Sequence, residues 1–125
     1  MTVAALTELF LMHMGYARAD AAEPDVVAEY AGTLMRWLNE GYTRAVLRTL
    51  GREAVKCLDP LRAEEDEPVK LDASLHPLLA DYAAARGQEL RGNTSEAGGL
   101  YAAFERGLSE AVQDRAFAFR AWRRL

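Results

Sequence analysis

The sequence has too little cysteine for a disulfide-stabilised protein and no apolar run long enough for a membrane. Cys57 is the single cysteine in 125 residues, so no disulfide can form within the chain, which suits a reducing compartment or indifference to redox state. Residues 3–14 are mostly apolar, but they include Glu8 and His13 and have no positively charged start. No stretch reaches the about 20 apolar residues that a membrane-spanning helix needs, so we expect no membrane segment.

Motifs of catalytic and metal-binding proteins are also missing. The patterns HExxH, CxxC and GxGxxG and the Walker loop do not occur. Cys57, His13 and His76 do not share a metal-ligand spacing. The acidic run, residues 64–67, lacks the alternating ligands and the central glycine of a calcium-binding EF-hand loop. We therefore expect no catalytic residue, no cofactor and no metal site, and we interpret the two histidines as partly buried or capping side chains.

Charge of one sign is not in large excess. Lys and Arg number 15 and Asp and Glu number 19, which gives a formal net charge of −4. This excludes a uniformly basic nucleic-acid-binding protein and leaves room for a local basic patch. A chain of this length buries roughly two thirds of the surface of its unfolded form, so we expect residues 1–125 to form a single domain.

What the sequence does contain is helical periodicity in four segments. Capping residues, prolines and glycines mark the ends of these segments. The four predicted helices begin at Thr2, at Pro24, at Asp72 or Ser74, and at Asn93, and the first three end at Gly15, Gly51 and Gly92. The fourth either continues to the C-terminus or breaks near Asp114. No strand pattern is convincing, so the predicted fold class is all-α, a four-helix bundle-like domain.

The apolar faces of these helices predict the core. Trp37, Asn39 and Tyr42 could line a ligand pocket, but aromatic residues at helical spacing are more often core, so we assign them to packing. Gly98 and Gly99 either weaken the fourth helix by roughly 1 kcal/mol each relative to alanine or mark the close approach of another backbone. The predicted core residues are Leu6, Leu9, Phe10, Met14, Val27, Tyr30, Leu34, Trp37, Leu38, Gly41, Ala45, Val46, Leu50, Leu75, Leu78, Leu79, Tyr82, either Ala85 or Arg86, Ala97, Tyr101, Phe104, Leu108, Ala111 and Val112.

Between the second and third helices lies a long irregular connection, residues 52–73. Asp59–Pro60, the acidic run and Pro68 follow one another too closely for a regular helix. Scattered apolar residues predict one or two short extended pieces, for which a hairpin is one arrangement. A connection this long is usually functional or flexible. The acidic run is either a solvated loop or a surface that a basic partner recognises, and its residues are Glu64, Glu65, Asp66 and Glu67.

The C-terminal segment, residues 113–125, combines arginines with aromatic residues and has no acid after Asp114. These residue types dominate the energetics of protein interfaces. The alternatives are a docking role, or a core extension by Phe119 and Trp122 with arginines that keep the chain end soluble. Nucleic-acid or membrane binding is a third alternative, although so few charges give limited affinity at physiological salt. The candidate partner-binding residues here are Arg115, Phe117, Phe119, Arg120, Trp122, Arg123 and Arg124.

The order of several segments is similar to that of a known family. After the short apolar first helix come LMRWLNEGY at 34–42, DEPVKL at 66–71 and LHPLLADYAAA at 75–85. The next features are a Gly92–Asn93 break and a helix with Ala97, Tyr101, Phe104–Glu105 and Leu108. Over residues 1–112 this order resembles the small helical head-to-tail connector (adaptor, or neck) proteins of tailed bacteriophages and prophages.

The resemblance implies a virion structural protein without a catalytic site. Connector proteins form a ring beneath the portal protein at the capsid vertex, extend the DNA channel and give a tail or stopper protein a place to dock. The implied state is a homo-oligomeric ring on assembly, built from a chain that can be monomeric in isolation. DNA passes through such a ring without sequence-specific binding. The implied location is the virion neck, and the host bacterial cytoplasm during assembly.

We hypothesise that the acidic loop, residues 63–70, and the arginine-rich tail, residues 115–125, are contact elements, with the loop or the tail becoming ordered only on assembly. An acidic loop that faces the channel and repels passing DNA is an alternative. Two other classes stay open. One is a non-catalytic bacterial helical interaction or regulatory domain, and the other is a DNA-binding protein that depends on Arg120, Arg123 and Arg124. An enzyme is the least favoured class.

Overall fold

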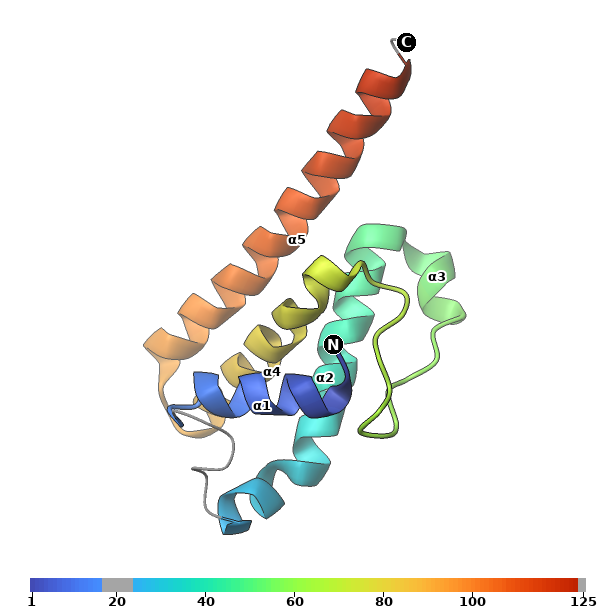
Figure 1. Ribbon diagram of the computed structural model, residues 1–125. Coiled ribbons are helices and arrows are strands. Elements are labelled where there is room, and N and C mark those ends of the chain that lie inside the picture. The colour runs from blue at the N-terminus through green and yellow to red at the C-terminus, as the bar shows by residue number, and fades with distance from the viewer. Residues whose placement is uncertain (17–23, 124–125) are drawn as a thin grey trace.

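The described part of the chain consists of helices and their connections. The computed structural model describes residues 1–16 and 24–123, and all side chains within these ranges except those of 24–29, 31 and 115–123. The elements are, in order, α1 (Val3–His13), α2 (Pro24–Leu50), α3 (Arg52–Lys56), a short 3-10 helix η2 (Ala73–Leu75), α4 (His76–Leu90) and α5 (Thr94–Arg123). No strand occurs in the described ranges, so the predicted all-α class is confirmed (Figure 1).

Local sequence signals define most helix ends. α1 begins as predicted because the Thr2 hydroxyl accepts a hydrogen bond from Ala5 N at 3.2 Å. It ends before Gly15, with φ +105°, and α2 ends before Gly51, with φ +93°, in the left-handed region that glycine adopts without strain. Pro77 lies in the first turn of α4, where its missing N–H costs nothing.

The central helix is α4, which packs against α1, α2 and α5 (Figure 1). Its alanines at Ala80, Ala83, Ala84 and Ala85 are all fully buried. The prediction of one apolar face for this helix was too narrow, because alanines that lie on several sides give no helical period. Burial on three sides leaves α4 with little surface for a partner.

A glycine lies where α4 comes close to each of its three neighbours, α1, α2 and α5. A Cβ added at Gly41 of α2 would lie 3.0 Å from Tyr82 Cδ1 of α4, and one added at Gly107 of α5 would lie 2.7 Å from a leucine of α4. On the third side, a Cβ added at Gly87 of α4 would lie 2.9 Å from Met14 Cε, just beyond α1. Interaxial distance depends on the side chains at the contact, so these glycines allow all three neighbours to approach α4.

The predicted core is largely buried, with one clear exception. Leu50 is wrong as a core residue, since it is 42% exposed in the last turn of α2, beyond Val46, the last buried residue of that helix. Val27 lies outside the described side chains. Six other predicted residues are half-buried at the margin of the core, namely Leu9, Leu75, Leu78, Tyr101, Ala111 and Val112.

The connection between α2 and α4 begins differently from the prediction. Residues 52–56 form α3, and no strand pairing is present in the described residues, so the expected extended pieces and hairpin are not found. Ala54 and Val55 of α3 are both half-buried against the core. Neighbouring side chains of a strand point to opposite faces, so the burial of both residues on the same side favours a helical turn. The remaining residues, 57–72, form an irregular loop that runs along α2 (Figure 1).

The last helix does not break at Asp114. α5 continues as one helix of 30 residues to Arg123, and its final turns extend beyond all other helices (Figure 1). Leu108 is buried, Ala111 and Val112 are half-buried, and the following two residues are exposed. We call residues 113–125 the C-terminal arm.

Replacing Gly98 with alanine is expected to stabilise the protein. A Cβ at Gly98 would meet nothing within 4 Å, and alanine is favoured over glycine within a helix by about 0.8–1 kcal/mol. The matched variant Gly41→Ala should be less stable than wild type, because its Cβ would press on the Tyr82 ring. Urea unfolding compares the two. A Gly98→Ala protein that loses stability would contradict the open surroundings of this position.

Candidate functional site

The acidic run supports the start of α1 with its backbone. Val3 N donates a hydrogen bond to Asp66 O at 2.8 Å, and Ala4 N donates to Glu64 O at 2.9 Å. The first N–H groups of a helix have no partner within the helix, so these carbonyl oxygens satisfy two donors that the Thr2 cap leaves open. The acidic run is thereby attached to the body through main-chain bonds.

Asp66 closes the turn that presents the acidic run. Its carboxylate accepts hydrogen bonds from Arg62 N at 2.8 Å and from Ala63 N at 2.9 Å. These bonds, with that from Arg62 first, hold the pKa of Asp66 below its usual value, because they stabilise the charged form. The other carboxylates of the run, on Glu64, Glu65 and Glu67, are exposed. Asp66 is therefore structural, and the three glutamates form the surface.

The other side of the 57–72 loop is fixed to α2. The Asn39 amide makes two bonds to the Leu61 backbone, accepting from its N at 2.7 Å and donating to its O at 2.9 Å. The Tyr42 hydroxyl accepts a hydrogen bond from Lys70 N at 3.0 Å. Burial raises the pKa of Tyr42, so this hydroxyl stays neutral at physiological pH. Leu61 is itself buried.

These contacts correct one expectation about the loop. We expected the loop or the tail to become ordered only on assembly, and for the loop this is wrong, because α1 and α2 hold it within the single chain. Trp37 and Tyr42 are buried, and Asn39 is occupied by the loop backbone. The three residues that could have lined a ligand pocket thus serve packing and loop attachment.

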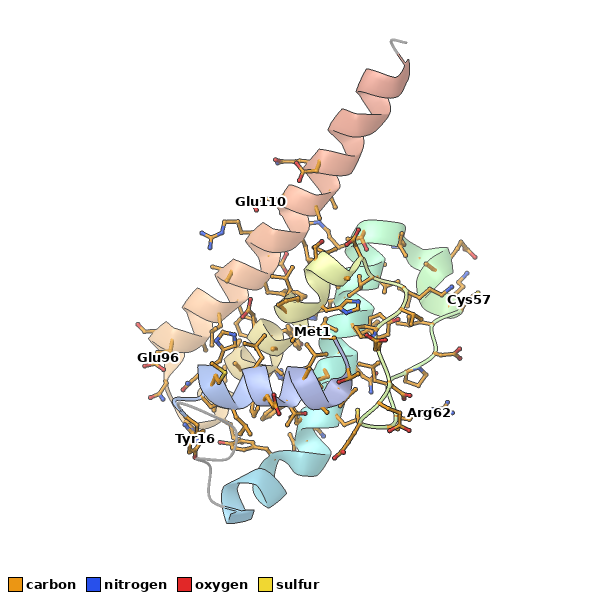
Figure 2. The ribbon with its side chains drawn as sticks, viewed as in Figure 1. Met1, Tyr16, Cys57, Arg62, Glu96 and Glu110 are labelled. Carbon is orange, nitrogen blue, oxygen red and sulfur yellow. The ribbon has the colours of Figure 1, made fainter. Side chains whose placement is uncertain are left out.

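Both histidines take part in hydrogen bonds of the fold. His76 is 5% exposed, and its Nδ1 lies 2.8 Å from the Met1 amine while its Nε2 lies 3.1 Å from Leu71 O. The charged amine can only donate, so Nδ1 accepts and Nε2 donates. The amine also lies 3.3 Å from a carboxylate oxygen of Glu67. Figure 2 shows Met1 between α4 and the loop, with Arg62 at the outer edge of the loop.

His13 pairs with a carboxylate of α4. Its Nε2 lies 2.9 Å from Asp81 Oδ1. Burial raises the pKa of Asp81, and the neighbouring His13 ring opposes that rise. The pair joins α1 to α4 at the half-buried edge of their contact, which agrees with the interpretation of this histidine as structural.

Arginines on the exposed side of α2 are balanced by other groups. Arg48 donates to Glu105 at 3.1 Å, and the guanidinium carbon of Arg44 lies 5.3 Å from the centre of the Tyr82 ring. Arg86 of α4 lies 3.6 Å from a carboxylate oxygen of Glu40. This face therefore carries both signs of charge and is a poor match for a nucleic-acid backbone.

A cavity that the sequence did not predict opens beside the acidic run. It has a volume of about 180 Å³, lies between α1 and the first half of α2, and has Glu64 among its lining residues. The other lining residues are mostly apolar, among them Phe10, Tyr30, Leu34 and Leu38. Periodicity marked these positions as core but could not show that facing stripes leave space between them.

The predicted contact elements occupy separate parts of the molecule. The acidic run lies at the start of α1, whereas the C-terminal arm leaves the body where α2 ends (Figure 1). The structure therefore does not bring the loop and the arm together. Arg124 lies outside the described residues, and α5 contains Arg115, Phe117, Phe119, Arg120, Trp122 and Arg123 at positions whose side chains are not described.

Comparisons with known proteins add no relative. No family model, no curated protein and no solved structure matches the chain. Among residues 1–16 and 24–123, no helix is long and apolar enough to cross a membrane. In the same part of the chain, no three His, Cys, Asp or Glu side chains form a group that could hold a metal ion.

Asp66→Asn is expected to lower the free energy of unfolding at neutral pH. It should also reduce the further loss of that free energy on acidification. Since the folded pKa of Asp66 is lowered, its contribution is complete above the unfolded pKa of about 3.9 and is lost as pH falls through the folded value. Urea unfolding at neutral pH and at about pH 3 should therefore show a smaller acid-induced loss in Asp66→Asn than in wild type. The control Glu65→Gln should keep the wild-type profile. Equal losses in wild type and Asp66→Asn would contradict the proposed hydrogen-bonded role.

Deleting residues 115–125 is expected to leave the fold intact, because the described burial in α5 ends before the arm. Thermal unfolding followed by circular dichroism should show little change in Tm. As a positive control, Phe104→Ala removes a side chain that is 1% exposed and should cost about 3–5 kcal/mol. A large fall in Tm on deletion would instead support the core interpretation of Phe119 and Trp122.

Proposed function

We infer that this chain is a non-catalytic assembly subunit, namely a head-to-tail connector of a tailed bacteriophage or prophage. It forms a ring under the portal protein, offers a docking surface to a tail or stopper protein, and surrounds DNA without reading its sequence. In this role it acts in the virion neck and, during assembly, in the host bacterial cytoplasm.

One observation carries this proposal: a compact body presents two unlike contact elements on separate sides. The acidic run is held rigidly by α1 and α2, while the arm leaves the body as a continuation of α5. Contacts between two different faces of identical subunits generate closed rings or open filaments. A subunit with one acidic face and one arginine-rich arm suits such contacts, since opposite charges favour the correct pairing and repel the incorrect one.

The segments behind the family resemblance lie where they fix the fold. Residues 34–42 supply Asn39, Gly41 and Tyr42, which hold the loop and approach α4. Residues 66–71 include the carbonyl that supports α1, and residues 75–85 lead into and form most of α4. A resemblance in such segments supports a shared fold more strongly than one in exposed segments, because these positions tolerate few substitutions.

A bacterial interaction or regulatory domain is the second candidate. The same acidic run and arm would serve it, with a partner other than a portal protein. A DNA-binding role would draw mainly on the arginines of the arm, because Arg44, Arg48 and Arg86 of the body each have an acidic or aromatic neighbour.

The test is co-expression with the portal protein encoded near this gene, followed by electron microscopy. We expect rings of this chain on the portal, and we expect genes for capsid and tail proteins in the neighbourhood. The chain without residues 115–125 should fold but bind the portal less well. A matched full-length control is Arg106→Ala, which changes an exposed arginine of α5 outside the arm and should still form rings.

The contradicting outcome is a chain that stays monomeric and never binds the portal at high concentration. Binding to duplex DNA that falls steeply with salt and depends on Arg120, Arg123 and Arg124 would instead favour the DNA-binding class. A neighbourhood without portal, capsid and tail genes would favour the bacterial interaction domain.

A further inference from the structure

We propose that the C-terminal arm of one copy docks into the cavity between α1 and α2 of the next copy. This contact rests on the proposed assembly function and specifies which surfaces join neighbouring subunits. It is a heterologous contact, because the arm of each subunit and the cavity of each subunit bind different neighbours.

The receiving site is an apolar cavity of the right size for an aromatic ring. Its volume is about 180 Å³, and an apolar cavity of about 150 Å³ accommodates a benzene molecule. Phe10, Leu34 and Leu38 are at most 4% exposed and give the cavity firm apolar walls. Thr7 and Met35 also line it and are half-buried. Among the described residues, the cavity is therefore open on the side of Thr7 and Met35.

The mouth of the cavity carries negative charge. Glu64 lines it and is exposed, whereas Glu65 and Glu67 line a different hollow beside Tyr42. Hydrogen bonds to α1 fix the backbone at Glu64, so the main chain there needs little further ordering when a partner binds. The site thus combines an apolar interior with an acidic residue on a fixed backbone.

The arm has the complementary chemistry. After Asp114 it contains four arginines, three aromatic residues and no acid. Aromatic and arginine side chains are the common anchors of protein interfaces, with the ring filling a pocket and the guanidinium pairing with carboxylates at the rim. A partner with these properties is present in the chain itself, so no second protein is needed to explain the cavity.

The arm cannot reach the cavity of its own chain. From Leu38, at the cavity, α2 runs for another twelve residues to Leu50, about 18 Å along its axis. Leu50 and Asp114 lie together where the arm leaves the body, and α5 then continues away from the other helices (Figure 1). The contact must therefore form between copies, and its repetition builds a ring or a filament.

Disulfide trapping tests this contact in the full chain. In a Cys57→Ala background, Thr7→Cys places a thiol at the cavity and Ala121→Cys places one beside Trp122 of the arm. Mixing the two single variants and oxidising them should give a dimer that contains one copy of each, and the double variant should give a ladder of larger species. The control replaces Thr7→Cys by Ala102→Cys on the exposed side of α5 and should trap far less.

Charge reversal tests whether attraction between Glu64 and the arginines of the arm contributes to the contact. Glu64→Arg in the cavity partner, or Arg120→Glu with Arg123→Glu in the arm partner, should each lower the yield of trapped dimer several-fold. Combining the reversed cavity with the reversed arm should restore it. Circular dichroism confirms that each variant is folded, so that a low yield reports on the contact.

The results separate this contact from the proposed function. Equal trapping at Thr7→Cys and Ala102→Cys, or charge reversals without effect, would overturn the docking contact even if rings form on a portal. In that case the arm binds another protein or another surface. Specific trapping without portal binding would instead leave the contact standing and remove the connector role.

Discussion

The close packing of α1, α2 and α5 against α4 is the constraint on which the rest of the structure depends. α4 has neighbours on three sides, and at each contact lies a glycine whose added Cβ would come within 2.7–3.0 Å of a side chain of the facing element. Fully buried alanines along α4 complete this arrangement. Small residues keep the axes close, so larger side chains such as Tyr82 and Phe104 can pack against each other around them. A domain of modest length obtains a well-packed core in this way.

The position of α1 against α4 has a consequence for the acidic run. A helix docked at that place has open N–H groups in its first turn, and they need acceptors because Val3 is buried. The backbone of residues 64 and 66 supplies them, while Asn39 and Tyr42 fix the two sides of the loop. The run lies where it does because its carbonyls complete α1. Its glutamate side chains are exposed, so positively charged groups of a partner can pair with them.

The parts of the fold that could be predicted are those with local causes. Thr2, Gly15 and Gly51 act on the backbone within a few residues, so they marked helix ends correctly. The path of the 57–72 loop could not be predicted, because carbonyl acceptors occur at every residue and leave no signal in the sequence. The paired bonds of Asn39 to Leu61 join positions 22 residues apart, and a single sequence does not reveal such pairs. The cavity is likewise a property of two facing surfaces.

The arm illustrates how a helix can extend past its body. Starting a helix is unfavourable because several residues are ordered for one hydrogen bond, but lengthening an existing helix adds one bond for each residue fixed. α5 is already anchored by Phe104 and Leu108, so further turns require no new start even though no other helix runs beside them (Figure 1). Much of the backbone entropy of ordering the arm as far as Arg123 is thereby lost on folding, before any partner binds. A pre-ordered arm loses less freedom on docking, so a modest set of aromatic and charged contacts can hold neighbouring subunits together.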